Sequence, residues 1–310
     1  MKVVIDTDGG LDDALAILMA VNMLPPKTVV AITTVFGNVH VHQATHNVSK
    51  VLEVSADPSI PVYPGASGPL ISSLAIDAWD GHGPDGLGGA AGIINNNLGP
   101  QPNEAVPALV KYASMYPGEL VIITIGPATN LALAAKSDPL FASNIARVLH
   151  MGCTIRGEGN TTPHAEFNTA CDPEACQSML DMFAGKLTVV GWECTVEHGL
   201  SWEIYHDLVS AETRTAAFVR QICSAYESHA PHVPFILCDA YTVMLLVEPQ
   251  YVLETKLATC KVNLEDGPMR GACEWTPEDK LDRAIQVVWR MDTARFVHVL
   301  RRLVDEKCIS

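Results

Sequence analysis

The stretch Val3-Val4-Ile5-Asp6-Thr7-Asp8-Gly9-Gly10-Leu11-Asp12-Asp13 lies near the start of the chain and decides its fold. Residues 3–5 are β-branched and apolar, which predicts a short buried strand. Apolar side chains at positions 11, 14, 15, 18 and 19 follow the helical period, so a helix is predicted over 11–24, where Pro25 and Pro26 end it. A strand that turns through two glycines directly into a helix is typical of a parallel α/β sheet.

The same alternation continues along the first two thirds of the chain. Strands are predicted at 28–34, 120–125, 147–151 and 187–190, and helices at 42–54, 104–115, from 129 onward and at 173–183. This order predicts the α/β class, with a mostly parallel, Rossmann-like central sheet flanked by helices.

The last third of the chain follows a different pattern. Helices are predicted at 213–227, 240–247 and 293–304, and two strands, at 253–262 and 285–291, are expected to form a small β-hairpin or edge strands. Because no shift in composition and no internal repeat marks a boundary, a single domain over residues 1–310 is predicted.

Charge and hydropathy exclude several kinds of partner. The 310 residues carry 20 Lys and Arg against 35 Asp and Glu, and a net charge of −15 argues against nucleic acid or an anionic membrane surface as partner. Apolar residues make up 48% of the chain, but their uninterrupted runs are shorter than the ~18 residues of a membrane span. Since the first residues do not resemble an apolar leader, a cytoplasmic protein is expected.

Cysteines occur throughout the second half of the chain, at positions 153, 171, 176, 194, 223, 238, 260, 273 and 308. Their number, nine, is odd, and no Cys-x-x-Cys pair occurs. We therefore expect reduced thiols, most of them small core residues, and the spacing predicts no zinc site.

Four aspartates, at positions 6, 8, 12 and 13, fall within eight residues at the first strand–helix junction. Carboxylates this close repel one another unless a cation offsets their charge, and oxygen ligands favour Ca²⁺ or Mg²⁺ over zinc. Ligands of such sheets bind at the carboxyl ends of the strands, so residues 37–38, 124 and 152–171 are further candidates.

Two enzyme families carry acids after a first strand in this way. The chain resembles the inosine-uridine-preferring nucleoside hydrolases, whose signature Asp-x-Asp-x-Gly-x-Asp-Asp is matched by Asp6, Asp8, Gly10, Asp12 and Asp13, with Gly9 in place of a proline. Residues 3–9 also resemble the haloacid-dehalogenase-type phosphatases, in which Asp6 would be the nucleophile and Asp8 the acid–base of a Mg²⁺-dependent reaction. The pair Asp12-Asp13 is not part of the phosphatase pattern.

Later segments resemble the nucleoside hydrolases in the same order along the chain. They are residues 31–38, residues 124–131, the loop 159–168 with Asp172-Pro173-Glu174-Ala175 after it, and Cys238-Asp239-Ala240. Together with the first signature they span residues 3 to 239, and on these motifs the chain is identified as a member of that family.

The resemblance implies a Ca²⁺ site and a mechanism. Asp8, Asp13, the backbone carbonyl of Thr124 and Asp239 would bind Ca²⁺, and Asp8 would be the general base for the metal-bound water. The reaction would hydrolyse the N-glycosidic bond of a ribonucleoside through an oxocarbenium-like transition state, which nearby carboxylates stabilise. Family members are homodimers or homotetramers, so a homo-oligomer that serves nucleoside salvage is implied.

The ribose would be held by a second set of polar side chains. The resemblance assigns them as Asp12, Asn38, Met151, Asn160, Glu166 and Asn168. A non-catalytic, Ca²⁺-dependent nucleoside-binding protein remains an alternative, which would be expected to have an export signal and two lobes.

The end of the pocket that would receive the base departs from the family. Cys238 stands where family members have His or Trp, which leaves open which residue protonates the leaving base. The other candidates for the base pocket are Trp79, His82, Phe167, Tyr226, His229 and His232.

Overall fold

The computed structural model describes residues 1–71, 80–90, 101, 104–230 and 232–305. Their strands form one nine-stranded sheet in the order β3-β2-β1-β4-β5-β6-β9-β7-β8. The bounds are β1 (Lys2–Thr7), β2 (Val29–Thr34), β3 (Val62–Pro64), β4 (Leu120–Thr124), β5 (Ile145–Met151), β6 (Leu187–Val190), β7 (Val252–Val262), β8 (Cys273–Pro277) and β9 (Ile285–Met291). The sheet is parallel from β3 to β9, while β7 runs antiparallel to both of its neighbours.

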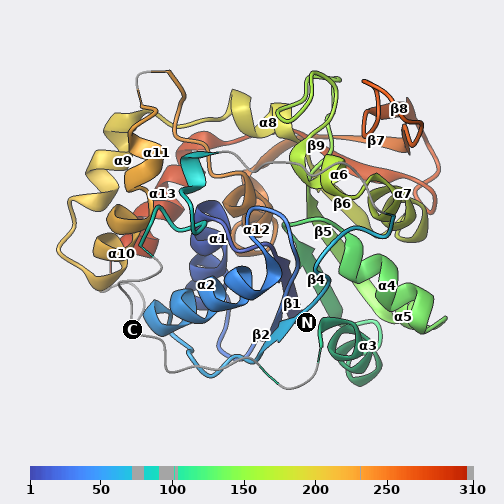
Figure 1. Ribbon diagram of the computed structural model, residues 1–310, viewed down its shortest axis with the longest axis horizontal. Coiled ribbons are helices and arrows are strands. Elements are labelled where there is room, and N and C mark those ends of the chain that lie inside the picture. Colours follow the sequence, from blue (N-terminus) through green and yellow to red (C-terminus); the bar gives the residue numbers. More distant parts are fainter. Residues whose placement is uncertain (72–79, 91–100, 102–103, 231, 306–310) are drawn as a thin grey trace.

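Helices cover both faces of the sheet, which confirms the predicted α/β class (Figure 1). One face carries α1 (Leu11–Met23), α2 (Val41–Val54), α12 (Cys238–Val247) and α13 (Thr293–Val304). The other carries α3 (Ala105–Met115), α4 (Thr129–Ser137), α5 (Phe141–Asn144) and α7 (Pro173–Met182). No described helix is both long and apolar enough to cross a membrane.

Short helices complete the described chain. They are α6 (Phe167–Cys171), α8 (Trp192–Glu197), α9 (Trp202–Val209), α10 (Arg214–Ile222) and α11 (Ser224–Glu227), with the 3-10 turns η1 (Asp80–His82) and η2 (Pro249–Tyr251). The helix predicted over 213–227 is therefore two helices, with Cys223 as the C-cap of α10 and the N-cap of α11.

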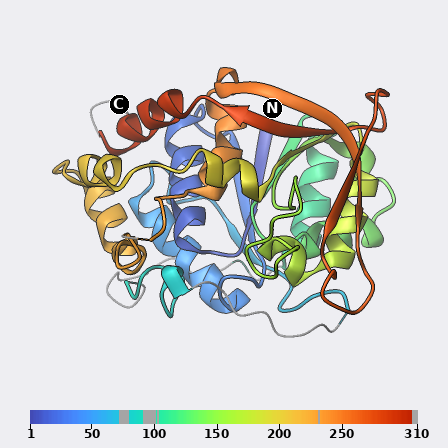
Figure 2. The ribbon, with the colours of Figure 1, turned by 90° about the horizontal axis from the view of Figure 1, so that it is seen from above.

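The C-terminal strands differ in part from the expectation. Strands β7 and β9 pair directly with each other, and Figure 2 shows them running side by side. However, β9 also pairs with β6 and so lies inside the sheet, and the antiparallel partner on the other side of β7 is β8. Strand β8 was not predicted because its residues alternate between exposed and half-buried positions and include no buried apolar face.

The strand order reverses direction at β1, the point where ligands bind in open α/β sheets. The next strand in the chain, β2, lies on one side of β1, and β4 lies on the other. Asp6 near the end of β1 pairs in register with Thr33 of β2 and with Thr124 of β4. Its carboxylate accepts hydrogen bonds from the Thr33 hydroxyl at 2.5 Å and from Asn130 Nδ2 at 2.8 Å. Strands β2 and β4 and helix α4 thus fix the start of the loop that carries the other acids.

Candidate active site

The carboxylate of Asp13 closes the turn between β1 and α1. It accepts hydrogen bonds from the Thr7 hydroxyl, from the Gly10 amide at 2.9 Å and from the Asp8 amide at 3.3 Å. Gly9 has a φ of +74°, and a Cβ added there would lie 2.7 Å from the backbone of α2. A left-handed position in such close contact favours glycine, and the turn brings acids from both of its ends together.

Asp8 is held by the loop that follows β2. The backbone amide of Asn38 donates to Asp8 Oδ2 at 2.8 Å, and Asn38 Nδ2 donates to Asp8 Oδ1 at 3.0 Å. Gly37 packs against the same carboxylate, since an added Cβ would lie 2.0 Å from Asp8 Oδ2. Asn38 therefore orients Asp8 and lines the pocket at the same time.

Three acids form the tightest carboxylate group among the described residues. Asp12, Asp13 and Asp239 each offer an oxygen, and these atoms lie within 4.8 Å of one another. Asp12 and Asp13 stand in the first turn of α1 and Asp239 in the first turn of α12, where helix dipoles favour negative charge. Oδ1 of Asp12 is buried and has no hydrogen-bond partner in the described part of the chain.

Burial and mutual repulsion raise the pKa of Asp8, Asp12 and Asp239. Desolvation, followed by the charge of Asp13, raises the pKa of Asp12 to about 7. The same two causes hold the pKa of Asp8 well above its usual range, and burial with the charges of Asp12 and Asp13 does so for Asp239. Buried carboxylate oxygens that repel one another fit a hard divalent cation such as Ca²⁺ or Mg²⁺, and one of them, Asp12 Oδ1, has no hydrogen-bond partner among the described residues and lies 3.9 Å from His82 Nδ1.

The four residues predicted to bind the metal differ in how they lie relative to the group of Asp12, Asp13 and Asp239. Asp13 and Asp239 belong to the tight group, whereas Asp8 adjoins it through its amide contact with Asp13. The carbonyl of Thr124 lies at the end of β4, where it accepts a hydrogen bond from His150 Nδ1 at 3.2 Å. Asp12, predicted to hold ribose, also belongs to the tight group.

The loop after β5 is organised by Glu166, which caps helix α6. Its Oε1 accepts from the Asn168 amide at 2.7 Å, and its Oε2 accepts from the amides of Cys153 at 3.0 Å and Thr169 at 2.9 Å. Desolvation raises the pKa of Glu166 to about 7 despite these donors. The side-chain nitrogen of Asn168 donates to the carbonyl of Met151 at 3.2 Å, which leaves its amide oxygen available to a ligand.

One pocket of about 440 Å³ brings most of the predicted residues together. Its walls include Asp12, Asn38, His82, Met151, Asn160, Glu166, Phe167, Asn168, Tyr226, Cys238 and Asp239. Asp8, Asp13 and Thr124 are buried beneath this surface. His229 and His232 are not among the described residues that line it, and Trp79 lies outside the described residues.

Six wall residues were not singled out from the sequence: Leu11, Ile125, Thr161, Trp192, Val233 and Ile236. Trp192 follows the last residue of β6 by two positions, so the rule that ligands bind at strand ends would have identified it. With Phe167 and Tyr226 it adds aromatic surface to a pocket that also carries carboxylates and amides.

His82, Tyr226 and Cys238, the titratable side chains at the predicted base end of the pocket, are poorly suited to act as general acids at neutral pH. Burial lowers the pKa of His82 to about 4, and it raises the pKa of Tyr226 and that of Cys238 well above their usual ranges. The Tyr226 hydroxyl donates to the carbonyl of Pro234 at 2.6 Å, and the Cys238 thiol lies 3.3 Å from the Thr195 hydroxyl. These groups can form hydrogen bonds, but none titrates near neutral pH.

The Rossmann-like sheet carries clustered acids and a polar, aromatic-walled pocket at its switch point. This combination is typical of an α/β enzyme that binds a small polar ligand beside a divalent cation. The chain belongs to the inosine-uridine preferring nucleoside hydrolase family, whose model matches residues 3–298.

Known relatives match over most of their length. The chain is 31% identical to the probable uridine nucleosidase 1 of Oryza sativa subsp. japonica, over 98% of this chain and 96% of the relative. It is 32% identical to the non-specific ribonucleoside hydrolase RihC of Salmonella enteritidis PT4, over 86% of this chain and 83% of the relative. The solved structure of an inosine-guanosine nucleoside hydrolase matches with a TM-score of 0.86 at 30% identity, covering 98% of both chains.

This membership decides between the alternatives that the sequence left open. The chain is a nucleoside hydrolase, the class of enzyme that hydrolyses the N-glycosidic bond of ribonucleosides. A haloacid-dehalogenase-type phosphatase and a non-catalytic binding protein are therefore set aside.

Replacement of Gly37 by alanine is expected to lower nucleoside-hydrolase kcat/KM by about 100-fold, because the new Cβ displaces the Asp8 carboxylate. Gly68→Ala is the matched control, since a Cβ at Gly68 meets no atom within 4 Å. Neither glycine has a positive φ, so both variants test space rather than backbone strain. Equal activities of the two variants, measured by steady-state kinetics, would contradict the positioning of Asp8 described above.

The raised pKa values predict how stability depends on pH. The folded, cation-free chain holds protons on Asp12 and Glu166 up to pH about 7, which the unfolded chain releases above about pH 4. The free energy of unfolding should therefore fall as pH rises from about 5 to 8. Because a divalent cation replaces these protons, the rise in Tm that it causes should be larger at pH 8 than at pH 6. Thermal unfolding with and without chelator tests this, and an equal rise at both pH values would refute it.

Proposed function

We propose that this enzyme hydrolyses ribonucleosides in a Ca²⁺-dependent reaction that releases the free base and ribose. The observation that supports this most strongly is the convergence of three kinds of group on one pocket. Asp12 and Asp239 bring the carboxylate cluster to its wall, Asn38, Glu166 and Asn168 supply polar contacts, and aromatic rings supply a flat apolar surface.

The cation is proposed to be Ca²⁺, held by Asp8, Asp13, the Thr124 carbonyl and Asp239. A bound Ca²⁺ would offset the repulsion among these acids, lower their pKa values and that of a nearby water molecule, and attract ribose hydroxyls. Asp12 Oδ1, buried without a hydrogen-bond partner in the described chain, is a further oxygen directed to the same group.

Asp8 is proposed as the general base that removes a proton from the attacking water. Both of its oxygens accept hydrogen bonds from Asn38, so the carboxylate has one orientation before the substrate enters. Cleavage of the N-glycosidic bond leaves positive charge on the ribosyl ring. Asp12 and Glu166 lie on the pocket wall, where their negative charge stabilises that transition state.

The ribose is proposed to bind through its hydroxyls to Asp12, Glu166 and Asn168, with Asn160 near the 5′-hydroxyl. Glu166 is fixed by three backbone amides, and the Asn168 nitrogen is engaged by the Met151 carbonyl. These contacts fix the donors and acceptors in advance, so little orientation is lost when the sugar binds.

The base is proposed to lie against Phe167, Trp192 and Tyr226, whose rings suit a flat heteroaromatic group. Cys238 stays a neutral thiol bonded to Thr195 and forms wall rather than acid. His82 is neutral and accepts from the Leu11 amide through Nδ1 at 3.4 Å, so its proton is carried on Nε2. It is therefore the base-end residue that we assign as hydrogen-bond donor to the leaving group.

The proposal also covers the domain organisation, the oligomeric state and the cellular role of the enzyme. The chain acts as a single catalytic domain over 1–310, as a homodimer or homotetramer, in cytoplasmic nucleoside salvage. Size-exclusion chromatography with light scattering tests the oligomeric state.

Chelation is expected to lower base release by at least about 100-fold, with recovery on adding Ca²⁺. The assay follows free base and ribose from a panel of purine and pyrimidine ribonucleosides, before and after chelator treatment and dialysis. Asp13→Asn should not recover with Ca²⁺, whereas Asp57→Asn, at a half-buried position that does not line the pocket, should recover fully. Undiminished release by protein shown to be free of metal would overturn the Ca²⁺ dependence.

The 2′-deoxyribonucleoside of the best substrate should react with a kcat/KM about 10⁴-fold lower, because the site then holds buried polar groups without partners. Asn168→Ala should narrow this ratio by slowing the ribonucleoside more than its deoxy analogue. Asn144→Ala, in α5 on the other face of the sheet, should leave the ratio unchanged. Equal turnover of both substrates by the natural enzyme would exclude recognition through the 2′-hydroxyl.

A further inference from the structure

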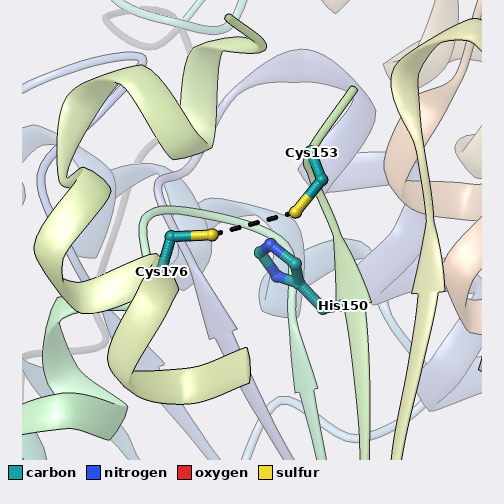
Figure 3. A group of neighbouring side chains, drawn as sticks. All are labelled: His150, Cys153 and Cys176. Atoms are coloured by element: carbon teal, nitrogen blue, oxygen red, sulfur yellow. Dashed lines mark hydrogen bonds between the residues drawn. The ribbon is translucent and has the colours of Figure 1, made fainter. Parts of the chain in front are cut away.

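A second group of ligand atoms lies behind the wall of the substrate pocket. His150 belongs to β5, Cys153 to the loop that follows it, and Cys176 to α7. All three side chains are buried, and their ligand atoms lie within 4.8 Å of one another. Figure 3 shows the imidazole beside the two thiols, with one ring nitrogen turned toward the two sulfur atoms. We propose that this group is a zinc site, separate from the carboxylate cluster.

The tautomer of His150 suits a metal ligand. Nδ1 lies 3.2 Å from the Thr124 carbonyl, which can only accept, so Nδ1 carries the proton and Nε2 has a lone pair. Nε2 is buried and has no hydrogen-bond partner among the described residues. Histidines that bind metal through one nitrogen commonly donate from the other to a carbonyl in this way. A buried lone pair without a donor is costly unless a ligand uses it.

The two sulfur atoms have the spacing that zinc requires. Cys153 Sγ and Cys176 Sγ are 3.8 Å apart. Zn–S bonds of about 2.3 Å in a tetrahedron place two sulfurs about 3.8 Å apart, so neither thiol has to move. A disulfide requires about 2.05 Å and would need one sulfur to shift. Soft thiolate and imidazole ligands also favour Zn²⁺ over the Ca²⁺ expected at the carboxylates.

The Cys273 thiol in β8 lies near this group, since it interacts with the Cys153 thiol. It is not one of the three residues whose ligand atoms lie within 4.8 Å of one another, so it would have to move closer to complete a Cys₃His set. The three residues already grouped leave the fourth tetrahedral position to Cys273 or to a water molecule, and the ion would join β5 and α7.

The backbone at Cys153 points to a role for its side chain. Cys153 has a φ of +66°, a left-handed conformation that favours glycine and is strained for a residue with a β-carbon. Its amide also donates to Glu166 Oε2 at 3.0 Å and to the Thr169 hydroxyl at 3.1 Å. A metal bound through Cys153 would hold this strained residue, and with it the carboxylate that faces the pocket.

The test measures zinc in the full-length enzyme, purified under reducing conditions without chelator. Elemental analysis should find about one zinc ion per chain. Cys153→Gly and Cys176→Ser should each retain less than about a tenth of that amount. Cys153→Gly also relieves the backbone strain, and an unchanged far-ultraviolet circular dichroism spectrum of each variant separates loss of zinc from misfolding. Cys194→Ser, at a buried cysteine outside the group, and Asp13→Asn, at the carboxylates, should both retain zinc.

Replacement of zinc by Co²⁺ provides an independent spectroscopic test of the site. Co²⁺ added to zinc-free enzyme should produce a thiolate-to-cobalt charge-transfer band that Cys176→Ser lacks and Asp13→Asn keeps. Two results would overturn the proposal: zinc-free natural enzyme that shows no such band with Co²⁺, or zinc content that is equal in all four variants.

Discussion

The repulsion among buried carboxylates at the end of β1 is the constraint on which the rest of the structure depends. Asp8, Asp12, Asp13 and Asp239 are withdrawn from water, and oxygens of the last three lie within 4.8 Å of one another. The pKa values of Asp8, Asp12 and Asp239 rise unless positive charge compensates. The fold supplies part of that charge through the N-termini of α1 and α12 and through amide donors in the turn. The remainder is left to a cation and to the developing charge of a ribosyl group.

The sheet topology places the groups that use this charge. Because the strand order reverses at β1, the ends of β1, β2 and β4 meet at one crevice, and the loop after β5 closes it from the side. Glu166 is fixed mainly by backbone amides, with the Thr169 hydroxyl as a further donor at 3.0 Å, which makes its position depend on the loop conformation. The residues that we propose to bind the sugar are thus held by the loop in the absence of substrate, while the aromatic wall includes Trp192 and Tyr226 from the short helices α8 and α11.

The periodicity of apolar residues predicted the longer strands and helices of the first 190 residues, but not the three-residue strand β3 or the short helices α5 and α6. The acids with the loop at 159–168 predicted most of the described residues that line the pocket. Three further features escaped the sequence for physical reasons. Strand β8 carries no buried alternating face, and Trp192 begins α8, two positions after the end of β6 and outside the motifs that resemble the family. The group of His150, Cys153 and Cys176 joins a strand, a loop and a helix, so its spacing matches no local cysteine pattern.

The position of β1 inside the sheet also affects how the chain folds while the ribosome synthesises it. Strand β1 and helix α1 are synthesised before their partners, because β1 is paired with β4 and α1 packs on α12, whose residues emerge more than a hundred positions later. Until then, the apolar side chains of Val3, Val4 and Leu18 lack those partners. Such long-range pairing slows folding and leaves these apolar segments exposed to aggregation during synthesis.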